Sequence, residues 1–196
     1  MRLGILTGGG DCPGLNAVIR AAVVRTIRTH ESQIVGFLDG WVGLLEGRTM
    51  ELTVESIRGI LPRGGTILGT SRVDPMKRPG GIEAVRDAVR LFRLDGLIVC
   101  GGDGTLNAAA TVAEAGLPVI GVPKTIDNDI PGTDYSFGFD TALGTVVHAI
   151  DQLHSTAESH DRVIVVDAIA GGIDRFRPFG DLYERDPAFD VARHRL

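Results

Sequence analysis

Short runs of apolar residues recur along the chain, and most are followed by a glycine-rich or acidic stretch and then by a segment with helical spacing. This alternation is typical of a parallel β-sheet covered by helices. Several of the runs are apolar throughout, as strands buried on both faces are. We expect strands over Leu3–Leu6, Ile34–Leu38, Gly96–Cys100, Pro118–Val122 and Arg162–Val166.

The segments between these runs carry the spacing of amphipathic helices. It predicts helices over Leu15–Arg28, Ile82–Arg93, Leu106–Ala115 and Thr141–Glu158, and the apolar residues around Trp41 indicate a further short, buried helix. The fold class is therefore α/β, an open and mostly parallel sheet with helices on both faces, in the manner of a Rossmann domain.

The character of the sequence changes near its end. Residues 168–196 mix arginine with aspartate and glutamate and show weak apolar periodicity. We expect one domain over residues 1–167 and a divergent, partly disordered tail over residues 168–196.

Composition narrows the function classes. A chain of 196 residues with 43% hydrophobic and 23% charged residues is typical of a folded globular domain. Its formal net charge of −5 argues against a nucleic acid or an anionic membrane as partner, because both need concentrated Lys and Arg. Cys12 and Cys100 lie in apolar, glycine-rich segments, as reduced thiols do, and no apolar run approaches the roughly 20 residues that span a bilayer. These features favour a cytoplasmic protein.

Glycine is the unusual residue, with 27 positions in 196, and it clusters after the predicted strands. Ligands bind at the carboxyl ends of the strands in an open parallel sheet, so these loops are the candidate site. The first loop runs from Gly8 to Asn16. Its glycines allow the backbone to approach a phosphate group, and the following helix offers free N–H groups to an anion. A tight turn without a ligand is the alternative.

The second loop, Gly101–Leu106, again joins a strand to a helix. It offers backbone amides to an anion and, at Asp103, a carboxylate for a magnesium ion bound to nucleotide phosphates. The alternative is that Asp103 caps the following helix. Neither glycine loop is a Walker motif, because no Gly-Lys-Ser or Gly-Lys-Thr follows the glycines.

The third loop, Pro123–Asp129, holds Lys124, which is one of only two lysines in the chain. On an extended segment Asp127 and Asp129 would point the same way. Carboxylates beside a transferring phosphoryl group repel it unless they serve a metal or accept the proton of the attacking hydroxyl. A solvated polar turn is the alternative.

Taken together, these residues resemble a known family. The stretches Gly8–Asn16, Gly101–Thr105, Pro123–Asp129 and Ser155–Arg162 are similar in order and spacing to those of 6-phosphofructokinases, and the likeness extends to about residue 167. It implies the N-terminal domain of that fold. It also implies phosphoryl transfer from ATP, with Mg²⁺, to the 1-hydroxyl of fructose 6-phosphate.

The resemblance also implies roles for individual residues. Asp127 would be the general base, Thr125 would contact the transferred phosphoryl group, Lys124 would belong to the same catalytic loop, and Asp129 would lie beside the sugar. Arg162 would reach the 6-phosphate of the sugar in a neighbouring subunit, which implies a homo-oligomer, a tetramer in the family. Asp103 would lie at the magnesium ion. The phosphoryl donor would be bound by Gly10, Arg72, Gly102, Asp103, Gly104 and Thr105.

The sequence departs from the family pattern after Asp167. The Met-Gly-Arg segment expected there is missing, and the second, sugar-binding domain is largely absent. We therefore expect the chain to bind nucleotide but to turn over fructose 6-phosphate poorly by itself.

Three alternatives remain open. Pyrophosphate-dependent relatives carry Asp where Gly104 stands, which favours ATP here, but they also carry lysine at the position of Lys124. Lipid and NAD kinases have a similar Gly-Gly-Asp-Gly-Thr loop but lack the third loop. A nucleotide-binding remnant without turnover would keep only the donor side of the site.

Overall fold

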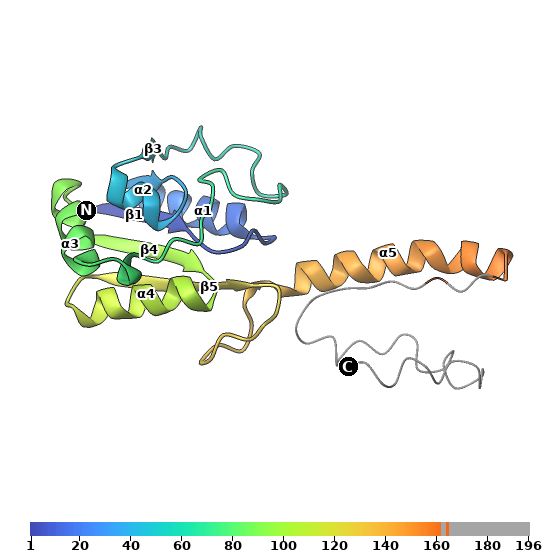
Figure 1. Ribbon diagram of the computed structural model, residues 1–196. Helices are drawn as coiled ribbons and strands as arrows, with labels where there is room; N and C mark the ends of the chain where they lie inside the picture. The colour runs from blue at the N-terminus through green and yellow to red at the C-terminus, as the bar shows by residue number, and fades with distance from the viewer. Residues whose placement is uncertain (162–163, 165–196) are drawn as a thin grey trace.

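The computed structural model describes residues 1–161 and residue 164. Its centre is a six-stranded sheet with the strand order β3-β2-β1-β4-β5-β6 (Figure 1). All neighbouring strands run parallel except β2 and β3. The strands are β1 (Arg2–Thr7), β2 (Gln33–Phe37), β3 (Thr49–Glu51), β4 (Gly96–Gly101), β5 (Val119–Thr125) and β6 (Phe137–Gly138).

Helical segments connect these strands. The helices are α1 (Leu15–Val24), which continues as the π-helix η1 (Arg25–Thr29), α2 (Trp41–Glu46), the 3₁₀-helix η2 (Pro75–Lys77), α3 (Gly81–Leu91), α4 (Asp103–Glu114) and α5 (Phe139–Ser159). No helix among the described residues is long and apolar enough to cross a membrane.

Two buried apolar clusters lie on opposite faces of the sheet, between the sheet and the segments that cover it. On one face, Ile5 of β1 packs with Ile19 of α1 and with apolar residues of the long segment after β3. On the other face, Leu6 of β1 packs with residues of α2, α3 and α4. Successive residues of a strand point to opposite faces of the sheet, so Ile5 packs in one cluster and Leu6 in the other. The expected α/β sheet with helices on both faces is confirmed.

The predicted elements agree with the structure in kind and differ at their ends. Four of the predicted strands correspond to β1, β2, β4 and β5. Of the predicted strand Arg162–Val166 only Ile164 is described, and it is not part of a strand, whereas the tail 168–196 lies outside the described residues. The short strands β3 and β6 were not predicted, because two or three residues are too few to show a period.

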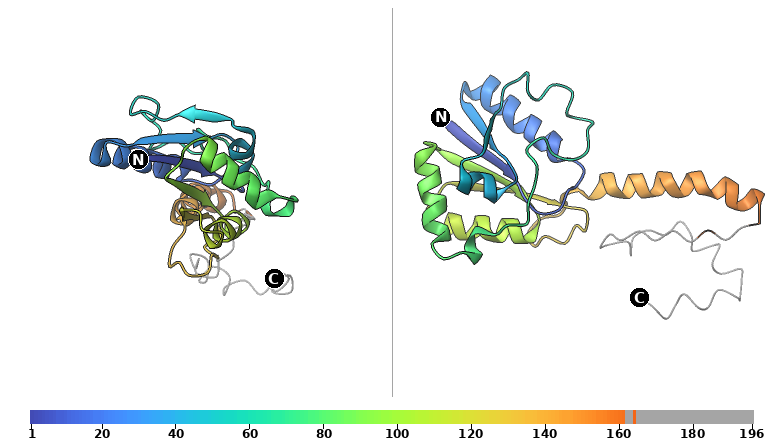
Figure 2. Two further views of the ribbon diagram at one scale, coloured as in Figure 1. Left: turned by 90° about the vertical axis from the view of Figure 1, so that its left-hand side faces the viewer. Right: turned by 45° about the horizontal axis from the view of Figure 1, so that its top comes forward.

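The apolar segment of β5 is less buried than its sequence indicates. Ile120 is 66% exposed, and the strand pairs with β6 only through Lys124 and Thr125. The following helix, α5, contributes no buried residue and projects away from the sheet (Figures 1 and 2). Residues 119–123 of β5 therefore pair with β4 on one edge and have no strand on the other edge among the described residues.

Candidate active site

Three loops meet at the carboxyl edge of the sheet. Because β1 pairs with β4 and β4 pairs with β5, all in parallel, the loops that follow these strands lie side by side. They are the three loops that the sequence singled out. The structure thus confirms that they converge.

The first glycine loop packs directly on α4. A Cβ atom at Gly8 would lie 2.9 Å from the Thr105 side chain, and one at Gly101 would lie 2.4 Å from it. Gly9 has a φ of +87°, which favours glycine. The Gly8 amide donates to the Cys100 carbonyl at 2.8 Å. Close approach to Thr105 therefore explains glycine at positions 8 and 101, and the positive φ explains it at position 9.

Helix α4 begins at Asp103 and not at Leu106 as the apolar spacing predicts. Gly102 is its N-cap and no side chain caps it, so the alternative in which Asp103 is a capping residue is wrong. The Asp103 carboxylate instead accepts a hydrogen bond of 3.1 Å from Asn107, one turn along the helix. Without a side-chain cap, the first amides of α4 remain available to an anion.

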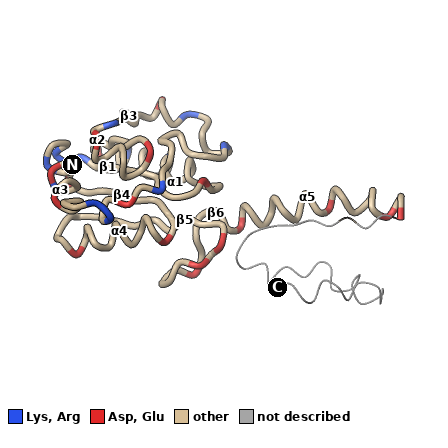
Figure 3. The backbone as a smooth tube through the Cα atoms, viewed as in Figure 1, with Lys and Arg blue, Asp and Glu red and all other residues tan. Residues whose placement is uncertain are grey.

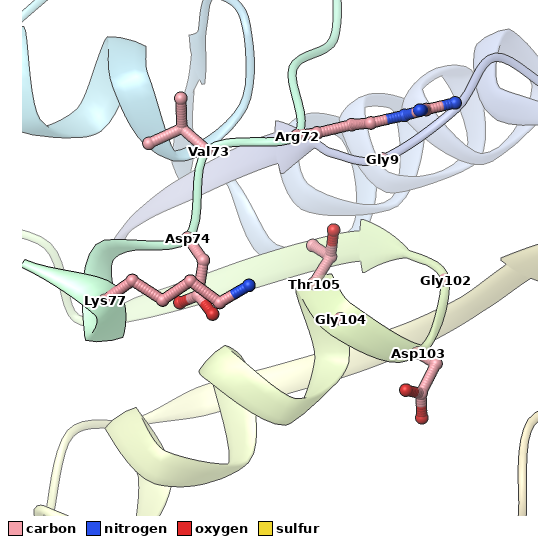
Figure 4. A pocket seen from close by; sticks show the side chains of 9 residues that line it. All are labelled: Gly9, Arg72, Val73, Asp74, Lys77, Gly102, Asp103, Gly104 and Thr105. Carbon is pink, nitrogen blue, oxygen red and sulfur yellow. The ribbon is translucent and has the colours of Figure 1, made fainter.

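A cavity of about 280 Å³ lies between the first turn of α4 and the segment that leads into η2 (Figure 4). Of the donor-binding residues expected from the sequence, all except Gly10 line it. Figure 4 shows Arg72 lying along Gly9 and the Lys77 side chain extending from η2 toward the start of α4. The cavity is lined by Gly9, Arg72, Val73, Asp74, Lys77, Gly102, Asp103, Gly104 and Thr105.

Sequence reasoning did not assign the donor to four of these lining residues: Gly9, which stands in the first candidate loop, and Val73, Asp74 and Lys77, which stand outside all three loops. The signal for Lys77 was available, because the chain has only one other lysine, Lys124. Asp74 has a structural role as the N-cap of η2, where its side chain accepts from the Met76 amide at 2.9 Å. That cap fixes the turn from which Lys77 extends.

Lys124 is the link between the third loop and the first. Its side chain is buried, with 3% exposed, and its ammonium group donates to the Gly10 carbonyl. Burial disfavours the charged form and lowers the pKa of Lys124 below its ordinary value, while Cys12 and Asp11 partly oppose this effect. Gly10 therefore enters the site as the acceptor for Lys124 rather than as a cavity wall.

The third loop is not the extended segment that the sequence predicts. Strand β5 ends at Thr125, the chain then bends, and Asn128 adopts a left-handed conformation with a φ of +51°. The Thr125 hydroxyl accepts from the Asp127 amide at 3.1 Å and lies 3.5 Å from Asp129. Thr125, Asp127 and Asp129 are thus brought together by a turn and not by strand alternation.

Two polar residues that the sequence did not single out hold this turn. The side-chain oxygen Oδ1 of Asn128 accepts from the Ser136 backbone amide at 2.9 Å, and the Ser136 hydroxyl donates to the Thr125 backbone carbonyl at 2.9 Å. Ser136 is 5% exposed. Figure 3 shows acidic positions gathered in this loop between β5 and β6.

The two cysteines lie against these loops as buried thiols, which agrees with their expected reduced state. Burial raises the pKa of Cys12, an effect that the charge of Lys124 opposes and the charges of Asp11 and Asp127 reinforce. The influence of Asp127 places its carboxylate within electrostatic reach of the first loop. Burial likewise raises the pKa of Cys100 to about 12.

Among the described residues, no group of three or more His, Cys, Asp or Glu side chains could hold a metal ion by itself. Mg²⁺ is commonly held by one or two carboxylates together with substrate phosphates. Asp103, on the cavity wall, could be the carboxylate of such a shared Mg²⁺ site. Arg162, expected at a sugar phosphate, lies outside the described residues.

Comparisons with known proteins identify the family of the chain. Residues 2–172 match the family model described as Phosphofructokinase. The chain is 54% identical over 170 residues to the pyrophosphate–fructose 6-phosphate 1-phosphotransferase of Streptomyces coelicolor, covering 86% of this chain and 50% of that protein. It is 53% identical over 169 residues to ATP-dependent 6-phosphofructokinase 3 of the same organism, with the same coverage.

The fold is likewise shared. The phosphofructokinase structure from Saccharomyces cerevisiae matches with a TM-score of 0.70 and 31% identity, covering 81% of this chain and 24% of that one. The chain spans about half the length of the curated relatives it matches. With a family model that spans most of its length and a cavity at the shared edge of its sheet, the chain belongs to the phosphofructokinase family.

Proposed function

We propose that the chain binds ATP in the cavity beside α4 and transfers its terminal phosphoryl group to the 1-hydroxyl of fructose 6-phosphate, giving fructose 1,6-bisphosphate. The observation that carries the proposal is the convergence of the donor cavity and the Asp127 loop at one edge of the sheet, joined by the bond from Lys124 to Gly10. Membership of the phosphofructokinase family supports the same reaction class.

The cavity offers what a polyphosphate needs on two sides. The uncapped first turn of α4 presents backbone amides and the positive end of the helix dipole. The opposite wall supplies the cationic side chains of Arg72 and Lys77. Donors on both walls would hold the phosphate chain along the start of α4.

Asp103 would hold the magnesium ion together with the phosphates of the donor. The ion would supply charge neutralisation for the phosphate oxygens. The bond from Asn107 orients the Asp103 carboxylate for this role.

On the acceptor side, Asp127 would act as the general base. The Thr125 hydroxyl accepts from the Asp127 backbone amide, and Ser136 and Asn128 hold the turn, so the backbone that carries the carboxylate is held before the sugar arrives. A base held in place removes the proton from the 1-hydroxyl as that oxygen attacks the phosphoryl group. We place Asp129 beside the sugar and Arg162 at the 6-phosphate bound by a neighbouring copy of the chain.

Pyrophosphate is the second candidate donor. The buried ammonium group of Lys124 favours it, as does similarity to a relative named for pyrophosphate. ATP is favoured by the open space at Gly104, where an added Cβ would meet no protein atom within 4 Å. We side with ATP because excluding a nucleotide requires a side chain in that space, whereas an extra ammonium group can stabilise either donor.

Replacing Asp127 tests the reaction. In any form of the protein that turns over fructose 6-phosphate, Asp127→Asn should lower the rate of phosphoryl transfer by about 10²–10⁴-fold relative to the same form without the substitution, because an amide cannot accept the proton. The affinity for magnesium-ATP should change by less than about twofold, since Asp127 does not line the donor cavity. Transfer is measured by product formation and donor affinity by calorimetry.

The matched control is Asp151→Asn, which removes a carboxylate from the exposed surface of α5. It should leave both quantities unchanged. An unaltered transfer rate in Asp127→Asn would remove Asp127 from the mechanism.

A further inference from the structure

Residues 66–71, which we name the crossing segment, pass over the carboxyl ends of β1 and β2 immediately before Arg72. The buried Thr7 hydroxyl at the end of β1 donates to the Gly69 carbonyl at 2.7 Å and lies 3.0 Å from the Thr66 hydroxyl. The Asp39 amide after β2 donates to the Leu68 carbonyl at 2.8 Å. The segment is therefore held to two strand ends by short polar contacts.

A third set of contacts joins the crossing segment to the glycine loop. The Thr70 hydroxyl donates to the Gly9 carbonyl at 2.7 Å, and the Gly9 amide donates to the Ser71 carbonyl at 2.8 Å. Both backbone polar groups of Gly9 are thus bonded to adjacent residues of the crossing segment. Gly9 itself lines the cavity.

The next residue along the chain is Arg72, which lies along Gly9 in Figure 4 and lines the same cavity. The Ser71 hydroxyl donates to the Asp39 carbonyl at 2.7 Å, which fixes the chain just before Arg72 leaves the crossing segment. The pair of bonds to Gly9 therefore couples two parts of the cavity wall that are about 60 residues apart in sequence.

We infer that Thr70 is a positioning residue for the phosphoryl donor, because its hydroxyl fixes Gly9 relative to the backbone that carries Arg72. This inference rests on the proposed function, in which the cavity binds the donor, and it concerns a residue that does not line the cavity. Gly9 has no side chain with which to hold its position. Without the Thr70 bond, part of the ordering of this wall would have to occur on donor binding, which lowers affinity.

The test is a double-mutant cycle on the full chain with magnesium-ATP and with pyrophosphate as probes. Thr70→Val keeps the shape of the side chain and removes the hydroxyl, and it should weaken donor binding by about 3- to 10-fold. In the Arg72→Gln background, Thr70→Val should lower donor affinity by less than about twofold, because the guanidinium group that Thr70 helps to position is absent. Thr70→Ser should restore binding, since it keeps the hydroxyl.

Hydrogen exchange supplies a readout that does not depend on donors. The Gly9 amide should exchange faster in Thr70→Val than in the unmodified chain. The melting temperature of the variant should change little. Thr145→Val, which removes an exposed hydroxyl bond within α5, is the matched control and should alter neither exchange at Gly9 nor donor affinity. Should Thr70→Val fail to fold, Thr70→Ala offers a smaller side chain for the same cycle.

The outcomes separate the two proposals. If the unmodified chain binds neither donor, the proposed function fails and the inference fails with it. If the donor binds but the losses from Thr70→Val and Arg72→Gln simply add, or if Thr70→Val leaves affinity and Gly9 exchange unchanged, the inference alone is overturned.

Discussion

Individual residues in this chain are constrained to very different degrees, as Gly101 and Gly104 illustrate. A Cβ atom at Gly101 would collide with Thr105, whereas one at Gly104 would meet open space. Both glycines are visible in the sequence, but their surroundings are not. A sequence alone shows where glycine stands and cannot show whether packing or a ligand requires it there.

Gly104→Asp tests the choice of donor. The carboxylate has room and lies in the first turn of α4, where a negative charge is favourable, so folding should be kept. It should weaken ATP binding at least about tenfold more than pyrophosphate binding, because it would stand against the nucleotide side of the donor. Calorimetric titration of both donors measures the ratio, with Gly104→Ala as the control for added volume. Equal losses for the two donors would contradict the preference for ATP.

Cys100 provides a prediction about pH. Burial raises its pKa to about 12, above its ordinary value, so the thiol stays protonated at pH 8, where an ordinary cysteine is partly ionised. Because the thiolate is the reactive form, alkylation of Cys100 in the folded chain should be at least about 100-fold slower than in the urea-unfolded chain. The rate should still be rising with pH at pH 9. Mass spectrometry of timed alkylation measures this, and rapid labelling of Cys100 in the folded chain would contradict the buried placement.

The elements of the fold show which sequence patterns carry information. The long helices and the strands β1, β2 and β4 have a full apolar period, and the sequence predicted them. Helix α4 begins three residues before the predicted start at Leu106. The prediction missed these residues because Asp103 and Gly104, which form the first turn, are poor helix formers. The local sequence predicts an extended segment at Asp127 and not the observed turn, because Asn128 and Ser136, which hold the turn, bond each other across eight residues.

Gly43 tests packing between elements. It lies within α2, and a Cβ there would be 1.9 Å from the Leu38 carbonyl oxygen, a backbone atom that cannot move aside cheaply. Gly43→Ala should lower the free energy of unfolding by about 1–3 kcal/mol. The control, Gly144→Ala in α5, meets no atom within 4 Å and should not destabilise the chain. Urea denaturation compares the two variants, and equal stabilities would show that α2 does not pack on Leu38 as described.

At the scale of the whole molecule, the order of the strands decides the site. Neither the pairing of β1 with β4 nor that of β4 with β5 is encoded locally, yet these pairings bring three loops from distant parts of the sequence to one edge. The loops themselves were predictable, because each follows a strand and carries glycine or acidic residues. The path of residues 66–77, which carries Arg72 and Lys77 to this edge, could not be predicted from the pattern of apolar residues. These residues have no apolar period and are held by hydrogen bonds.

The central claim is that the cavity between α4 and residues 72–77 binds the phosphoryl donor. Calorimetric titration of the unmodified chain with magnesium-ATP, repeated with Arg72→Gln and with Lys77→Gln, tests it most directly. The account predicts saturable binding of one ATP per chain, weakened at least about tenfold by either variant, because each removes a charge-assisted contact to the phosphates. It would be contradicted by a chain that binds neither ATP nor pyrophosphate, or by an affinity that both variants leave unchanged.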